Sequence, residues 1–250
     1  MISLIEILLE STQKPKAIFL AGPAGSGKSF ITKQLIPSSY NVINSDDTYE
    51  AMLKASGIGL NQKNFSPEQL SQAAKMQAQA RKVTDQRLQD AMDNRKNIVI
   101  DGTAASSNPV LKKKQQLEEL GYETLMLMIY VSPLLSLERN KNRERSLMPS
   151  IVLRTWRDVN KNISTYENAF ENFILLNNNL KDTDVSFSQE KIQPYLDDSK
   201  AIGKVKSEKD QAKSDEEKRE IMADISNLVK SFPNFITLDQ AKTKINSFIS

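Results

Sequence analysis

The sequence predicts an α/β fold with a five-stranded parallel sheet flanked by helices, and three observations support this prediction. Five short apolar segments, each of strand length, are separated by longer stretches with helix signals. Polar residues or glycine follow these segments, as expected where a buried strand ends. The length of 250 residues suffices for one full α/β domain, with about sixty residues to spare. The predicted strands are residues 17–21, 40–44, 97–102, 124–131 and 173–177.

Helix signals fill the stretches between the strands. The strongest is Ser66, because Pro67 and Gln69 follow it with the spacing of a proline-led capping box. Pro37 ends the first helix and Gly121 closes a later one. The predicted helices are residues 29–36, 48–58, 67–94 and 108–120, one from 133 and one around 151–159, with a short helix over the core at residues 2–9.

The composition shifts near residue 180, where we place the end of the main domain, residues 1–180. Residues 181–220 are rich in Lys, Asp, Glu and Ser, which predicts a charged linker or a solvated helix. Residues 221–250 carry two amphipathic helices, each with its apolar residues on one face. This small helical appendage either packs back onto the core or offers a surface for a protein partner or for self-association.

The composition also excludes several kinds of chemistry. The chain has no cysteine, which excludes disulfides and thiol catalysis and fits a reducing cytoplasm. It has no histidine, so a general base has to be a carboxylate, and a histidine-rich metal site is excluded. The net charge of +3 does not demand a nucleic-acid partner. No apolar run is long enough to span a membrane and the first ten residues lack the features of a secretory signal, so we expect a cytoplasmic protein.

Residues 22–29 carry the strongest functional signal. They match the phosphate-binding-loop pattern G-x-x-x-x-G-K-[ST] and lie between a predicted strand and a predicted helix. Glycines let several backbone N–H groups point at one phosphate chain, and the following helix directs its positive end to the same place. The pattern predicts the P-loop NTPase fold and ATP binding, with Lys28 reaching the β- and γ-phosphates and Ser29 holding Mg²⁺. The predicted nucleotide-binding residues of this loop are Gly22, Pro23, Ala24, Gly25, Ser26, Gly27, Lys28 and Ser29.

Acidic residues follow the second and third predicted strands. Asp46 and Asp47 come after residues 40–44, and Asp101 ends the next strand, two residues before Thr103. Because ligands bind at the carboxyl ends of parallel strands, these residues are candidates for substrate contact and chemistry. Asp101 suits either Mg²⁺ organisation or binding of a substrate hydroxyl. The alternatives are a solvated turn or a helix cap for the first pair, and a turn residue for Asp101.

Four cations are crowded into seven residues after the helix that begins near residue 133. They are Arg139, Lys141, Arg143 and Arg145, and Pro149 follows them. Arginine geometry matches phosphoryl oxygens, and a cationic connection of this kind is typical of a lid that closes over a transferred phosphate.

With these motifs in order, the chain resembles the kinase domain of phage polynucleotide 5′-kinases and the related zeta-toxin-type kinases. The resemblance covers about residues 16–178 and rests on GPAGSGKS, NVINSDD, IVIDGT and LERNKNRERSLMP followed by IVLR. It implies that Asp46 is the general base and that Asp101 binds the acceptor or organises the metal. It also implies that Arg143 stabilises the transferring phosphoryl group and that Arg139 is a second lid cation.

One position departs from the polynucleotide kinases. Those enzymes carry an arginine three residues beyond the base to hold the acceptor's 3′-phosphate, and here that residue is Tyr49. No D-x-D-x-T motif, the signature of the phosphatase domain that some of them carry, occurs after residue 180.

The resulting hypothesis is an ATP- and Mg²⁺-dependent kinase that phosphorylates a hydroxyl group, with a polynucleotide 5′-hydroxyl as the first acceptor. The alternatives are a small molecule (a nucleotide sugar as in zeta-toxin-type kinases, a nucleoside or a nucleoside monophosphate) and a modified base in DNA. From another class, the chain would be a nucleotide-gated binding module that holds a protein partner through residues 221–250.

Overall fold

The computed structural model describes residues 14–60, 65–179, 192, 208–231 and 235–250. The helix predicted at residues 2–9 lies outside the described residues, as does most of the predicted linker. Among the described residues, no helix is both long enough and apolar enough to cross a membrane.

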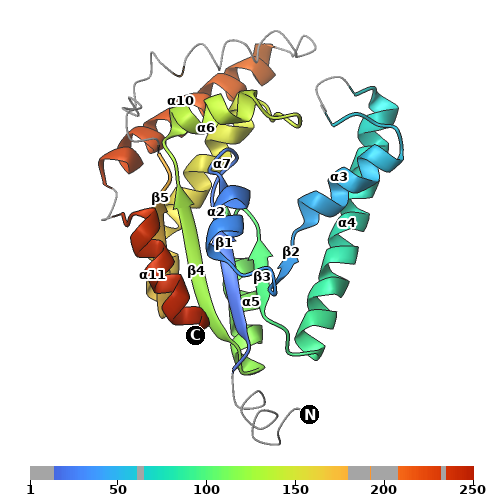
Figure 1. Cartoon of the computed structure of the whole chain (residues 1–250). Helices are drawn as coiled ribbons and strands as arrows, with labels where there is room; N and C mark the ends of the chain where they lie inside the picture. Colours follow the sequence, from blue (N-terminus) through green and yellow to red (C-terminus); the bar gives the residue numbers. More distant parts are fainter. Residues whose placement is uncertain (1–13, 61–64, 180–191, 193–207, 232–234) are drawn as a thin grey trace, which may run out of the picture.

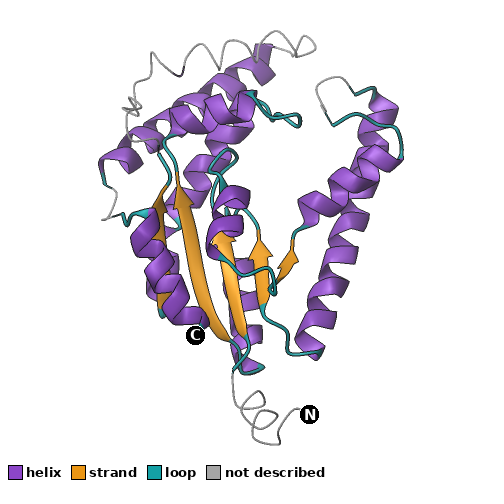
Figure 2. Cartoon of the chain, viewed as in Figure 1, coloured by secondary structure: helices purple, strands orange, loops and turns teal. Residues whose placement is uncertain are grey.

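The five predicted strands form one parallel sheet in the order β2-β3-β1-β4-β5 (Figure 2). The central strand β1 pairs with β3 on one side and with β4 on the other. Ile236, just before the last helix, adds a single parallel bridge to Leu176 at the β5 edge. The fold prediction is therefore confirmed. The strands are β1 (Lys16–Ala21), β2 (Asn41–Ile43), β3 (Ile98–Asp101), β4 (Glu123–Tyr130) and β5 (Asn172–Asn177).

The helices follow the predicted order with three differences. α3 begins at Ser45 rather than at 48, because Asn44 caps it immediately after β2. α8 was not predicted; it follows α7 after a break at Asn162. α10 begins at Glu208 and so crosses the predicted boundary at 220. The helices are α2 (Lys28–Leu35), α3 (Ser45–Ala55), α4 (Pro67–Asp93), α5 (Ser107–Glu119), α6 (Pro133–Lys141), α7 (Pro149–Lys161), α8 (Ile163–Ala169), α10 (Glu208–Lys230) and α11 (Leu238–Ile249).

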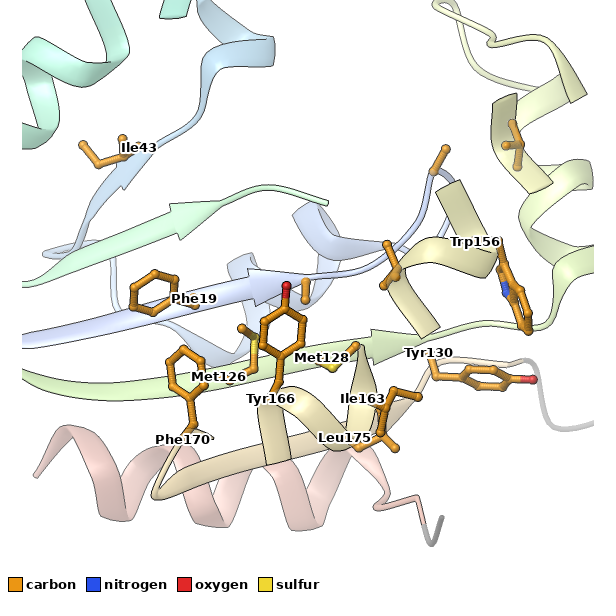
Figure 3. Close-up of a cluster of buried hydrophobic side chains, with 14 of the residues drawn as sticks. Phe19, Ile43, Met126, Met128, Tyr130, Trp156, Ile163, Tyr166, Phe170 and Leu175 are labelled. Carbon is orange, nitrogen blue, oxygen red and sulfur yellow. The ribbon is translucent and has the colours of Figure 1, made fainter. Parts of the chain in front are cut away.

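Alternate residues of the central strands build a separate core on each face of the sheet. On one face, Phe19, Met126 and Met128 pack with residues of α5, α7 and α8 (Figure 3). Phe170 makes an edge-to-face contact with Phe19, with ring centroids 5.3 Å apart. Trp156, fully buried, donates its indole N–H to the Val131 carbonyl at 2.7 Å, which anchors α7 beside the end of β4.

The two C-terminal helices cover opposite faces. Ile221 and Ile225 of α10 join the core on the α7 side, while Ile245 and Phe248 of α11 pack with β4 and β5 residues on the other. Within the described residues, the apolar faces of both helices therefore pack against the core.

Helices α3 and α4 form an arm beside β2, on the far side of the carboxyl ends of the strands from α6, α7 and α10 (Figure 1). The arm has its own apolar cluster, in which Tyr49 and Leu53 of α3 pack with Ala73 and Ala80 of α4. The phosphate-binding loop, α3 and the segment after α6 all meet at this end of the sheet.

Candidate functional site

The loop between β1 and α2 needs glycine at two of its positions. Gly25 and Gly27 have φ angles of 76° and 86°, in the left-handed region that side chains rarely adopt. A Cβ on Gly25 would lie 2.6 Å from the Ser136 carbonyl oxygen, and one on Gly27 would collide with the Asn178 amide. The two glycines therefore let the loop curl tightly against its neighbours, which leaves its backbone as the lining of the site.

The carbonyl groups of this loop are held from outside by three side chains. The Ser136 hydroxyl donates to the Ala24 carbonyl at 2.5 Å, and the Asn178 amide donates to the Ser26 carbonyl at 2.7 Å. Arg139 donates to the Gly25 carbonyl at 3.3 Å and, through its other terminal nitrogen, to the Asn178 carbonyl at 3.1 Å. With its carbonyls bound to α6 and to the segment after β5, the loop keeps its shape before any phosphate arrives.

Lys28, the first residue of α2, reaches back over the loop. Its Nζ donates to the Gly22 carbonyl at 2.7 Å. Burial lowers the pKa of the Lys28 ammonium; the charge of Asp101 acts in the opposite direction, and that of Arg143 lowers it further. The charges of Asp101 and Arg143 therefore act on the pKa of Lys28 in opposite directions.

Asn44 joins the two acidic strand tips. Its side-chain oxygen accepts the backbone N–H of Asp46 at 2.8 Å, and its amide donates to Asp101 at 2.9 Å. Burial raises the pKa of Asp101, whereas the positive charge of Lys28 lowers it. Asp46 and Asp47 lie in the first turn of α3, so the predicted turn is a capped helix start, with Asn44 rather than either aspartate as the cap.

Of the four cations predicted to form a lid, Arg139 and Lys141 lie in α6, whereas Arg143 and Arg145 lie in the segment between α6 and α7, residues 142–148, which is called the lid loop below. Asn140, only 3 % exposed, fastens its end with two hydrogen bonds to the backbone of Leu147, of 2.9 and 3.0 Å. Arg145 extends from the loop to α3, where it forms ion pairs of 3.1 Å with Asp46 and with Glu50. The lid loop thus contacts the arm that carries the predicted base.

One cavity of about 580 Å³ brings these parts together. It is lined by every predicted site residue except Gly22, which lies beneath it and whose N–H donates to the Thr103 carbonyl at 3.2 Å. A second hollow, of about 770 Å³, lies at the opposite ends of β1, β4 and β5, away from the loop. The hollow at the opposite end is the larger of the two, so volume alone does not identify the site. The smaller cavity is the candidate site because the phosphate-binding loop, the aspartates and the arginines all line it. Its lining includes Pro23, Ala24, Gly25, Ser26, Gly27, Lys28, Ser29, Asp46, Asp47, Asp101, Thr103, Arg139 and Arg143.

Four residues that contribute to the site were not singled out from the sequence. Ser136 and Asn178 hold the loop, Asn44 links the acids, and Glu50 shares Arg145 with Asp46. Only Asn44 had a local signal, since a polar residue between a strand and a helix is a typical N-cap. Position 49, where a cation was missing, is a tyrosine that is 2 % exposed and packs inside the arm.

Comparisons with other proteins bear on the family and the fold of this chain. The sequence profile of the zeta toxin family matches residues 4–202. Among solved structures, a chain of the PezAT chromosomal toxin–antitoxin system of Streptococcus pneumoniae is 16 % identical with a TM-score of 0.53, covering 76 % of this chain and 88 % of that one. A shikimate kinase from Acinetobacter baumannii in complex with shikimate is 17 % identical with a TM-score of 0.41, covering 77 % and 96 %.

The search of curated proteins gives no match. The match to the family profile nevertheless extends over more than half of the chain and includes the phosphate-binding loop, both acidic strand tips and the lid loop. The chain therefore belongs to the zeta toxin family and is a phosphotransferase with the P-loop kinase fold.

Proposed function

We propose that the protein transfers the γ-phosphoryl group of ATP to a hydroxyl group of a small molecule, with a nucleotide sugar as the first candidate. The observation that carries the proposal is the shared cavity, in which Lys28 of the loop, Asp46 of α3 and Arg143 of the lid loop face one space. Its volume is in the range of small-molecule sites.

On the donor side, the loop backbone and Lys28 hold the β- and γ-phosphates, and Arg143 disperses charge that develops on the transferring group. Arg139 acts mainly by holding the loop, because its guanidinium donates hydrogen bonds to the backbone carbonyls of Gly25 and Asn178. Its place in the cavity wall still lets it contribute charge toward the nucleotide.

On the acceptor side, Asp46 accepts the proton of the acceptor hydroxyl as its oxygen attacks the γ-phosphorus. The new O–P bond forms while the bond to the bridging β–γ oxygen breaks, and ADP leaves with that oxygen. A carboxylate base agrees with a chain that contains no histidine. Asp47, Asp101 and Thr103 line the same wall and are proposed to bind the acceptor.

The residues also fit a magnesium ion. Mg²⁺ is usually held by one or two protein oxygens together with substrate phosphates and water, rather than by a protein cage. Among the described residues no cluster of three or more acidic residues forms such a cage. The Ser29 hydroxyl and the Asp101 carboxylate, both in the cavity wall, are the two oxygens we assign to it. A magnesium ion held by these two residues would supply positive charge that neutralises charge on the phosphate oxygens.

A small acceptor is favoured over a polynucleotide for two reasons. Membership of the zeta toxin family supports the nucleotide-sugar hypothesis. Position 49 is a buried tyrosine, so the side chain at this position presents no cation to a 3′-phosphate. The polynucleotide 5′-hydroxyl is the second candidate, supported by the order of the motifs.

A transfer screen with γ-labelled ATP tests the proposal. The acceptors are UDP-sugars, nucleosides, nucleoside monophosphates, and 5′-hydroxyl DNA and RNA, including DNA with modified bases. With the wild-type protein, we expect label on a UDP-sugar and none on the oligonucleotides. With Lys28→Ala, we expect no label on any acceptor. Label only on oligonucleotides would overturn the small-molecule proposal in favour of the second candidate.

Two further assignments belong to this proposal. A cytoplasmic location is supported by the cysteine-free composition. A protein partner is supported by the likeness to a chain of a toxin–antitoxin system. ATP hydrolysis without label on any acceptor, combined with a stable partner on residues 221–250, would instead favour a nucleotide-gated binding module.

A further inference from the structure

Arg145 connects the lid loop to the helix that carries the proposed base. One terminal nitrogen lies 3.1 Å from Asp46 Oδ1 and the other lies 3.1 Å from Glu50 Oε1. Asp46 and Glu50 are four residues apart on α3 and so share one face of the helix. The planar guanidinium therefore binds two carboxylates that lie one helical turn apart. A lysine ammonium lacks the two separate terminal nitrogens of this arrangement.

The surroundings hold Arg145 in this place. Its side chain is only 13 % exposed, although it comes from a connecting segment. The guanidinium lies over the ring of Tyr49, which is itself packed inside the arm. At the far end of the lid loop, Asn140 fastens the backbone of Leu147. The arginine is thus fixed by its head group and by its loop.

Asp46, in contrast, has a side chain that is 59 % exposed. A short side chain with that exposure samples several rotamers in water, and each rotamer that turns away from the acceptor costs rate. The ion pair with Arg145 is made through Oδ1 of this carboxylate. Such an arrangement steers the carboxylate while leaving one oxygen to take a proton.

We propose that Arg145 is a positioning residue that orients Asp46 for proton abstraction, and that Glu50 acts through Arg145 by anchoring its guanidinium. The inference rests on the proposed role of Asp46 as the base. The two arginines of the lid loop then have different roles: Arg143 interacts with the donor phosphates, and Arg145 orients the base. Glu50 then has no contact of its own with the reacting atoms.

Arg145→Gln, Glu50→Gln and their double variant form a mutant cycle that tests this chain of contacts. The readouts are kcat and the KM values for ATP and for a UDP-sugar, with inorganic phosphate release from ATP measured in parallel. We expect Arg145→Gln to lower kcat about 10- to 100-fold, since misplacing a catalytic group costs rate rather than binding. Both KM values should stay within about threefold.

Three further comparisons separate positioning from a merely structural tie. Glu50→Gln should lower kcat less than Arg145→Gln and add nothing in the double variant. Arg145→Lys, which reaches one carboxylate but not both, should recover part of the lost kcat. Arg154→Gln removes an arginine that pairs with Glu217 outside the cavity and should leave kcat unchanged.

The outcomes distinguish this inference from the proposed function. Wild-type kcat in Arg145→Gln, a change in KM alone, or additive losses in the double variant would overturn the positioning role. If Asp46→Asn keeps full kcat, the base assignment itself fails. If no UDP-sugar accepts phosphate, the same cycle is decided on phosphate release from ATP, where Asp46 acts on water.

Discussion

Lys28 lines the cavity and interacts with three of the segments that form it: the phosphate-binding loop, β3 and the lid loop. Its amine contacts the carbonyl of Gly22 in the phosphate-binding loop, and its charge is influenced by Asp101 and Arg143 from two other elements. Because burial already disfavours the charged form, the ammonium depends on nearby negative charge, and phosphate oxygens supply that charge when a nucleotide binds.

Lys28→Ala is therefore expected to lower the affinity for ATP by at least about 30-fold, since hydrogen bonds to a charged group contribute roughly 2 kcal/mol or more. Isothermal titration calorimetry measures the change. Lys33→Ala, on the exposed side of α2, is the matched control and should bind ATP normally. An unchanged Kd for Lys28→Ala would remove the amine from nucleotide binding.

At the scale of elements, the lid loop is held by a small set of side-chain contacts, two of which come from Asn140. Asn140 is buried at the end of α6 and binds both the N–H and the C=O of Leu147. This double hydrogen bond closes the loop so that Arg143 and Arg145 face the cavity.

Asn140→Ala should loosen the lid loop. Loss of both hydrogen bonds leaves a partly buried N–H and C=O of Leu147 without the Asn140 side chain, which costs about 1 kcal/mol for each bond. We expect faster hydrogen exchange across residues 142–148 and a kcat lowered about tenfold. Asn160→Ala removes a comparable buried amide from α7, which donates to the Trp156 carbonyl, and should leave exchange in the lid loop unchanged. Equal exchange rates in the two variants would contradict the role of Asn140.

The elements also show what local sequence predicts and what it does not. Buried parallel strands are apolar on both faces, so the strands were predictable, and their tips placed Asp46 and Asp101 at one edge. The contacts of Arg145 with Asp46 and Glu50 were not predictable, because they join α3 to a segment more than ninety residues away. The start of α10 at Glu208 could not be located, because its first turns are almost entirely charged and polar, which predicts a linker as readily as a solvated helix.

At the scale of the whole molecule, helices from distant parts of the chain cover both faces of the sheet. α10 packs against α7 and α11 against β5, so each face is completed by the C-terminal residues. α10 is additionally paired to α7 by ion pairs such as Lys161 with Asp224 at 2.6 Å. Because α7 also lines the cavity through Thr155, α10 supports the wall of the site.

Ile225→Ala tests whether α10 belongs to this common core. Ile225 is fully buried, and truncation of such a side chain costs about 2–4 kcal/mol. Thermal or denaturant unfolding should show one transition shifted to lower stability, as expected for a single cooperative unit. Asn227→Ala, exposed on the same helix, should unfold like the wild type. A separate early transition in Ile225→Ala would indicate that the appendage folds independently.

The central claim is that Asp46 accepts the proton when the γ-phosphoryl group of ATP moves to a hydroxyl. The most direct measurement is single-turnover transfer of label from γ-labelled ATP to a UDP-sugar, with Asp46→Asn compared with the wild type. We predict that Asp46→Asn lowers the rate by about 10²- to 10⁴-fold with the ATP Kd unchanged, while Asp85→Asn, exposed on α4, transfers normally. Transfer by Asp46→Asn at the wild-type rate would contradict the account.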